Sequence, residues 1–282
     1  MKRMPLKTCL FAFAALLFTS LAQAQTTNFA EALRNGWISM DARLAGRFGE
    51  HALRLTLTNR HKKMELLIPA GWHFSAEDTT VQNALTTQDV LVSLEKDQKR
   101  TLRLHAFCTN ASKRSPQIDQ AYISKGPAEG NMKELAQYIH RNKIEPGEVQ
   151  GAVWSLSDDL DLTGIAHVGL AAFVAKLTGQ PVPEYFVRNG YQPEPGGPAY
   201  SYEPVSVEGL FEHRTEKEES VSFGLYNAAG EPVQMFFENK SWWAGQHRFK
   251  FTFSVWGFPG GEHEARLSDN SGRVLGSKRV SW

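Results

Sequence analysis

The sequence predicts a mainly β protein of the α+β class, in which two β regions flank a helical segment. Apolar residues alternate with period two from about residue 53 to 108, follow a helical period between 131 and 179, and alternate again from 220 to 282. Because strands and helices bury every second residue and every third or fourth residue respectively, these changes of period separate the elements. We predict an N-terminal antiparallel β-sandwich with about three helices, a Pro/Gly-rich linker and a C-terminal Ig-like β-sandwich.

Residues 1–24 have the features of a secretory signal peptide. A basic start is followed by the apolar run CLFAFAALLFTSLA and by AQA, a small-residue cleavage site. We therefore expect an exported protein, located in the periplasm, at the cell surface or outside the cell. No later stretch approaches the about 20 apolar residues that a transmembrane helix needs, so no transmembrane segment is expected. The predicted domains are 25–179, the linker 180–204 and 205–282.

The charge balance is nearly neutral, with 31 basic and 30 acidic residues in the whole chain. Three of the basic residues lie in the predicted signal peptide. A near-neutral protein has no electrostatic reason to bind nucleic acid, so we expect no nucleic-acid partner.

The first β region consists of short alternating runs. In LRLTLT, Leu53, Leu55 and Leu57 share one face, and VLVSL and TLRLHAF repeat the pattern. Alternation of this kind, broken by polar turns, is typical of an antiparallel sheet with one buried face. A small sandwich is the simplest form.

Three helices are expected in the middle of the chain. The first carries the apolar stripe of Leu135, Tyr138 and Ile139. Pro146 opens the second, and Thr163 can cap the third, which Gly179 ends. Six of the 13 prolines follow between 179 and 204, and this composition predicts a linker. Beyond it, about six short strands predict the second sandwich.

Cys108 is the cysteine that remains after removal of the predicted signal peptide with Cys9. A single cysteine cannot form an internal disulfide, and the Cys/His clusters of structural zinc sites are absent from the sequence. Strand alternation places Cys108 on the apolar face of Leu104 and turns His105 to the other face. We therefore predict a buried core residue, not the nucleophile of a hydrolase, and we predict no catalytic residue and no cofactor.

A second interpretation of Cys108 depends on a distant partner. AFCTN and EVQGAVW resemble the two signatures of bacterial thioester domains, in which a strand ends in an aromatic–Cys pair and a second segment supplies a glutamine. The resemblance implies that Cys108 and Gln150 lose ammonia to form an acyl bond open to nucleophiles. The alternative is that Gln150 is an ordinary polar residue near a helix start.

Two other clusters are candidate binding sites. Asp158, Asp159 and Asp161 could form a weak Ca²⁺ site, although the segment lacks the glycine and glutamate of an EF-hand loop. The alternative is that these three aspartates are ordinary solvent-exposed residues of a turn between two helices. Trp242 and Trp243 could stack on a ligand such as a glycan, or they could cover an open end of the core.

The last 65 or so residues resemble FlgD-like Ig domains, which include the C-terminal sorting domains of Bacteroidota type IX secretion. The resemblance is carried by a set of spaced residues: Tyr226, Gly230, Val233, Ala244, Gly245, His247, Gly261, Leu267 and Gly272. It implies an Ig-like fold used for export or attachment. The chain lacks the customary aromatic after PGG and ends in RVSW without a basic tail.

The N-terminal region resembles uncharacterised secreted modules, through Ile68 to Phe74, Gln82, Leu85, Phe107 to Asn110 and Val149 to Asp158. This resemblance implies no activity.

Two functions follow as expectations. The first is a secreted, non-catalytic binding protein that recognises a protein or glycan at the cell surface. The second is a thioester adhesin that bonds to a partner amine through Cys108 and Gln150. A separation of more than about 6 Å between these two side chains would make the bond implausible.

Overall fold

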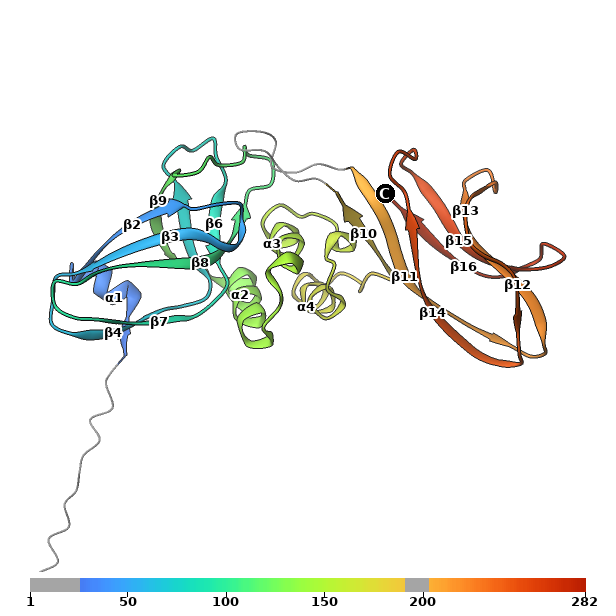
Figure 1. The fold of residues 1–282 in the computed structure, drawn as a ribbon, viewed down its shortest axis with the longest axis horizontal. Helices are drawn as coiled ribbons and strands as arrows, with labels where there is room; N and C mark the ends of the chain where they lie inside the picture. Colours follow the sequence, from blue (N-terminus) through green and yellow to red (C-terminus); the bar gives the residue numbers. More distant parts are fainter. Residues whose placement is uncertain (1–25, 191–202) are drawn as a thin grey trace, which may run out of the picture.

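The structure is a computed structural model that describes residues 26–190 and 203–282. The predicted signal peptide and part of the predicted linker lie outside the described residues. The chain is mainly β, as predicted, with helices concentrated between two β regions (Figure 1).

The N-terminal β region is a closed barrel. Its strands, in spatial order, are β2 (Ile38–Leu44), β3 (Gly49–Asn59), β8 (Lys99–Thr109), β6 (Asn83–Thr86), β5 (Trp72–Ala76) and β9 (Ala121–Pro127). The predicted sandwich differs from this arrangement because β9 pairs with both β2 and β5 and so closes the sheet. Closure removes the unpaired edges that an open sheet would leave.

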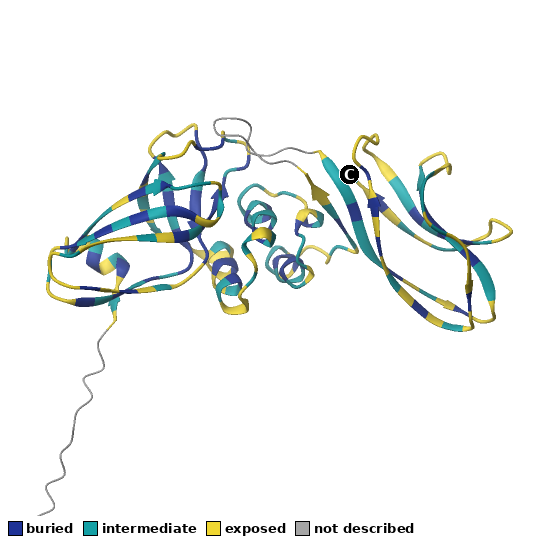
Figure 2. Ribbon diagram, viewed as in Figure 1, coloured by how far each residue is buried: buried dark blue, intermediate teal, exposed yellow. Residues whose placement is uncertain are grey.

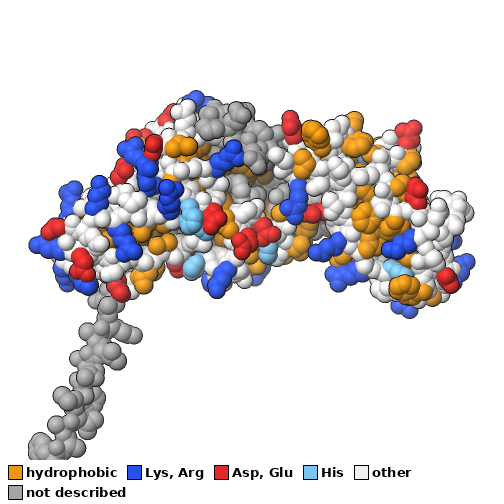
Figure 3. Space-filling model, viewed as in Figure 1, with side chains coloured by type: hydrophobic (Ala, Val, Ile, Leu, Met, Phe, Trp, Pro, Cys, Tyr) orange, Lys and Arg blue, Asp and Glu red, His pale blue; other side chains and the backbone are white. Residues whose placement is uncertain are grey.

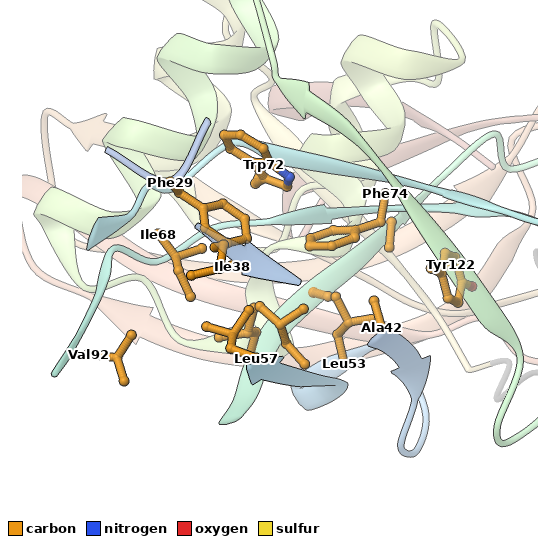
Figure 4. Close-up of a cluster of buried hydrophobic side chains, with 14 of the residues drawn as sticks. Phe29, Ile38, Ala42, Leu53, Leu57, Ile68, Trp72, Phe74, Val92 and Tyr122 are labelled. Atoms are coloured by element: carbon orange, nitrogen blue, oxygen red, sulfur yellow. The ribbon is translucent and has the colours of Figure 1, made fainter. Parts of the chain in front are cut away.

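A small three-stranded sheet packs against the barrel. It consists of β1 (Thr27–Asn28), β4 (Met64–Ile68) and β7 (Val90–Leu94). A short helix that the sequence did not reveal, α1 (Phe29–Arg34), follows β1 and is capped by the Asn28 side chain. Side chains from both sheets and from α1 share one apolar core, and Phe29, Ile68 and Phe74 lie together there (Figure 4).

The helices cover the end of the barrel that faces the C-terminal region (Figure 1). They are α2 (Gly130–Asn142), the 3-10 turn η1 (Pro146–Glu148), α3 (Gln150–Ser157), the turn η2 (Leu162–Gly164) and α4 (Val168–Thr178). The third predicted helix starts later than expected, because Asp161 caps the separate turn η2 and the His167 side chain accepts the N–H of Leu170 at the start of α4. Gly179 ends α4 in a left-handed conformation, as predicted.

The C-terminal region contains two sheets around one apolar core. One has the order β10 (Tyr185–Asn189), β11 (Pro204–Thr215) and β14 (Gly245–Ser254). The other has the order β13 (Pro232–Trp242), β12 (Glu219–Asn227), β15 (Glu262–Asp269) and β16 (Val274–Ser281). Strand β10 lies within the segment predicted as a linker, so that part of the segment is an edge of the C-terminal fold.

Buried residues form dark bands along the strands and the inner faces of the helices (Figure 2). The surface of the C-terminal region nonetheless carries many apolar side chains (Figure 3). None of the described helices is long and apolar enough to cross a membrane.

Candidate functional site

Cys108 lies near the end of β8, where helix α3 packs against the barrel. Strand β3 pairs with β8 only as far as Ala106, whereas β6 continues alongside β8 and faces Cys108 from the other side. The N–H and C=O of one strand residue point to the same side, so those of Cys108 would lack a strand partner where β3 has ended. The Gln150 side chain fills this position.

The Gln150 carboxamide contacts Cys108 in three ways. Its Oε1 accepts the backbone N–H of Cys108 at 3.0 Å, and its Nε2 donates to the Cys108 carbonyl oxygen at 2.8 Å. The Cys108 Sγ lies 3.2 Å from the same Oε1. Thiol and carboxamide are therefore in direct contact, well inside the separation that the thioester hypothesis requires.

Helix α3 holds Gln150 in this place through close packing. Val149, directly before the helix, is fully buried against the helical core. On the other flank, a Cβ added to Gly151 would lie 2.5 Å from the carbonyl oxygen of Gly164. Only glycine allows α3 to approach η2 this closely, so the position of Gln150 depends on Gly151.

Burial is the main influence on the Cys108 thiol and raises its pKa well above the usual range. The nearby Asp158 carboxylate acts in the same direction, whereas the Trp154 side chain and the backbone oppose it through hydrogen bonds. Cys108 therefore remains a neutral thiol at physiological pH. A cysteine hydrolase needs the opposite shift, and His105 packs its ring on His51 at a centroid distance of 5.0 Å.

A cavity of about 780 Å³ reaches both Cys108 and Gln150. Its volume falls in the range of small-ligand sites. Apolar and polar residues from the barrel, the helices and β10 line it, among them Phe48, Gln82, Phe107, Trp154 and Arg188. A molecule in this cavity would meet the paired thiol and carboxamide.

The loop after β8 is held by side-chain hydrogen bonds. Asn110 adopts a left-handed conformation with φ of 70°, and its Oδ1 accepts from Asn83 Nδ2 at 2.8 Å. The buried Gln82 donates to the Asn110 carbonyl oxygen, and its own carbonyl oxygen accepts from the Tyr122 hydroxyl. These bonds hold the end of β8, and with it Cys108, against the barrel.

The three aspartates of the predicted Ca²⁺ site have separate positions. Asp158 accepts the N–H of Ala111, and Asp161 accepts the N–H of Thr163. Asp159 has a left-handed φ of 54°. Two of the carboxylates thus hold backbone groups, and the three do not form a ligand cluster within the described residues.

The predicted tryptophan pair is divided. Trp242 is buried in the C-terminal core and stacks on His247 at a centroid distance of 4.2 Å. Trp243 is 70% exposed. Trp242 therefore belongs to the core, and Trp243 is the one that a ligand could reach.

A cluster that the sequence analysis missed lies on the outer face of the barrel. Glu50, His51 and His105 have their potential ligand atoms within 4.8 Å of one another. Burial, with the neighbouring His51, lowers the pKa of His105. The cluster depends on strand register and on a local irregularity in β3, neither of which the sequence signals.

Comparison with known proteins leaves the chain without an assigned family. No family model matches it, and no curated protein matches it. Among solved structures, a β-glucosidase from Kluyveromyces marxianus is similar over 81% of this chain, with 9% sequence identity and a TM-score of 0.21. The similarity spans 44% of the glucosidase chain. A TM-score this low carries no conclusion about fold or activity.

Proposed function

We propose that this protein is an exported thioester protein that acylates an amine through Cys108 and Gln150. One observation carries the proposal: the thiol is in contact with the carboxamide of Gln150 at a cavity, across 42 residues of sequence. The AFCTN and EVQGAVW segments, which suggest the same pair from the sequence, agree with this contact.

The bond-forming step is a balanced acyl transfer. The Cys108 sulfur attacks the side-chain carbonyl carbon of Gln150, and the C–N bond of the carboxamide breaks. The thiol proton leaves with the nitrogen, so that ammonia is released and a thioester remains. The backbone N–H of Cys108 already donates to Oε1, where negative charge would develop in the transition state, and this favours the attack.

A partner amine would then complete the reaction. Its nitrogen attacks the thioester carbonyl, an amide bond forms, and the Cys108 thiol is regenerated. Because Cys108 is buried beside the cavity, bulk water would have limited access to the thioester until an amine enters.

The second candidate is the non-catalytic binding protein. Two sheets around one core in the C-terminal region, together with the FlgD-like resemblance, favour an Ig-like domain used in export or attachment. The exposed Trp243 and Trp256 supply surface for a protein or glycan partner. In this case Gln150 only satisfies the backbone of Cys108.

The intact mass of the purified full chain separates the two candidates. We expect it to be lower than that of the unmodified polypeptide by one ammonia, and methylamine should add its own mass to the treated protein. Cys108→Ala should not lose ammonia, and neither should Gln150→Asn, which keeps the carboxamide but shortens its reach. An unmodified mass, with a thiol that titrates only after unfolding, would reject the thioester and leave the binding protein.

A further inference from the structure

We propose that Glu50, His51 and His105 form a binding site for a divalent transition metal of the Zn²⁺ class. The inference is independent of the thioester, because none of these three residues contacts Cys108 or Gln150. The two imidazoles come from neighbouring barrel strands, and the carboxylate precedes one of them.

An irregularity in β3 brings the three side chains together. In a regular strand, Glu50 and His51 would point to opposite faces and could not share an ion. The pairing of β3 with β8 shifts between Gly49 and Leu53, and His51 has a left-handed φ of 54°. A bulge of this kind changes the direction of a side chain, and here it places the rings of His51 and His105 edge to face.

The backbone conformation of His51 is uncommon for a residue with a side chain. Only a few per cent of non-glycine residues have a left-handed φ, although histidine, like asparagine and aspartate, is enriched among them. A left-handed φ costs free energy at a non-glycine residue. At His51 this φ also directs the imidazole toward Glu50 and His105, which suggests that the side chain serves as a ligand.

The distances suit a tetrahedral ion. Two ligands at the usual Zn–N and Zn–O lengths, about 2.0 to 2.1 Å, lie about 3.4 Å from each other in tetrahedral geometry. His51 Nε2 and Glu50 Oε1 are 3.5 Å apart, and no pair of ligand atoms in the cluster exceeds 4.8 Å. Glu50 and His51 are exposed, so small side-chain rotations can complete the geometry.

The donor set defines the class of ion. Two imidazole nitrogens and one carboxylate oxygen suit Zn²⁺, Cu²⁺ or Ni²⁺ better than Ca²⁺ or Mg²⁺, which prefer oxygen ligands alone. Three protein ligands leave a fourth position for water or for a group on a partner.

Calorimetric titration of the tag-free full chain with ZnCl₂ at neutral pH tests the site. We expect one Zn²⁺ per chain, with the affinity lowered at least about tenfold by His105→Gln and by His51→Asn. Asparagine tolerates the left-handed conformation, so His51→Asn should leave the bulge in place. His263→Gln is the matched control, because His263 also lies in a strand next to glutamates but belongs to the C-terminal sheet. The Zn²⁺ affinity of this variant should equal that of the wild type.

The absorption spectrum of the Co²⁺-loaded chain provides a second readout. Tetrahedral coordination without a thiolate predicts visible ligand-field bands and no sulfur-to-metal charge-transfer band. If either histidine variant unfolds, Glu50→Gln replaces it in the titration. The proposal is overturned if wild-type protein binds no Zn²⁺, if His263→Gln loses binding, or if the cluster variants bind as tightly as wild type.

Discussion

At the scale of the residue, Gln150 substitutes for a strand. Its amide donates to the carbonyl oxygen of Cys108 and accepts from the N–H of the same residue, as a neighbouring strand would. The same carboxamide also touches the thiol. One side chain thus satisfies the backbone of β8 beyond the end of β3 and also brings the carboxamide to the thiol, as the proposed chemistry requires.

Removing this side chain should cost stability even if no thioester forms. Gln150→Ala leaves the N–H and C=O of Cys108 without their partner, and we expect the free energy of unfolding to fall by about 1–3 kcal/mol. Urea denaturation followed by circular dichroism measures this change. Gln137→Ala, on the exposed face of α2, is the control and should change it little; equal stability of the Gln150 variant would mean that water replaces the amide at no cost.

His73 should make stability depend on pH. Its Nε2 is buried and has no hydrogen-bond partner within the described chain, and burial lowers its pKa from the usual 6.5. The unfolded chain therefore takes up a proton at a higher pH than the folded chain. The contribution of His73 to stability is therefore fully present above about pH 6.5, the usual pKa of histidine. It is lost as the pH falls from 6.5 toward the lowered pKa of His73 in the folded chain.

Substitution of His73 isolates this contribution. Between the two pKa values, one proton changes the free energy of unfolding by at most about 1.4 kcal/mol per pH unit. In His73→Phe we expect a shallower loss of stability on acidification, measured by urea denaturation between neutral and mildly acidic pH. Parallel curves for the two proteins would show that His73 does not contribute.

At the scale of the element, the position of α3 is decided by a glycine. Gly151 lies against the carbonyl oxygen of Gly164, and any side chain would push α3 away from η2. Such a movement would withdraw Gln150 from Cys108. Helix placement and the chemistry of the site are therefore coupled.

Gly151→Ala should weaken both the fold and the site. The clash should lower the free energy of unfolding by about 1–3 kcal/mol, and the fraction of chains that lack one ammonia should decrease. Gly147→Ala is the matched control, because a Cβ at Gly147 meets nothing within 4 Å. Thermal denaturation and intact mass measure the two effects, and an unchanged Gly151→Ala variant would show that η2 yields without cost.

Elements differ in how far the sequence predicts them. The alternation around Leu53 to Leu57 predicted β3, and these leucines are fully buried. The start of the third helix was misplaced because Thr163 resembles a cap, while the actual cap is the histidine side chain at residue 167. The cluster of Glu50, His51 and His105 was missed because the bulge that forms it has no signature in the local pattern.

At the scale of the whole molecule, β10 connects the two halves. Phe186 packs into the helical core, whereas its neighbours Tyr185 and Val187 pack against the C-terminal core. Because side chains alternate across a strand, one short strand contributes to both cores. The two regions therefore share an element and are not simply tethered by a linker.

Phe186→Ala should uncouple the halves. Loss of a buried phenylalanine costs about 3–5 kcal/mol, and we expect calorimetric unfolding to separate into two transitions. Phe258→Ala is the control, because Phe258 is 43% exposed and should leave the unfolding profile unchanged. Two transitions already present in the wild type would show that β10 does not couple the regions.

Local pattern by itself determined the class of the protein and which faces are buried: the period of the apolar residues predicted mainly β structure around a helical segment, and alternation predicted that Cys108 is buried. Only the tertiary structure decided that the first sheet closes into a barrel, that β10 joins the second fold and that Gln150 meets Cys108. The physical reason is that periodicity depends on neighbours along the chain, whereas barrel closure, strand register and side-chain contact depend on packing between distant segments.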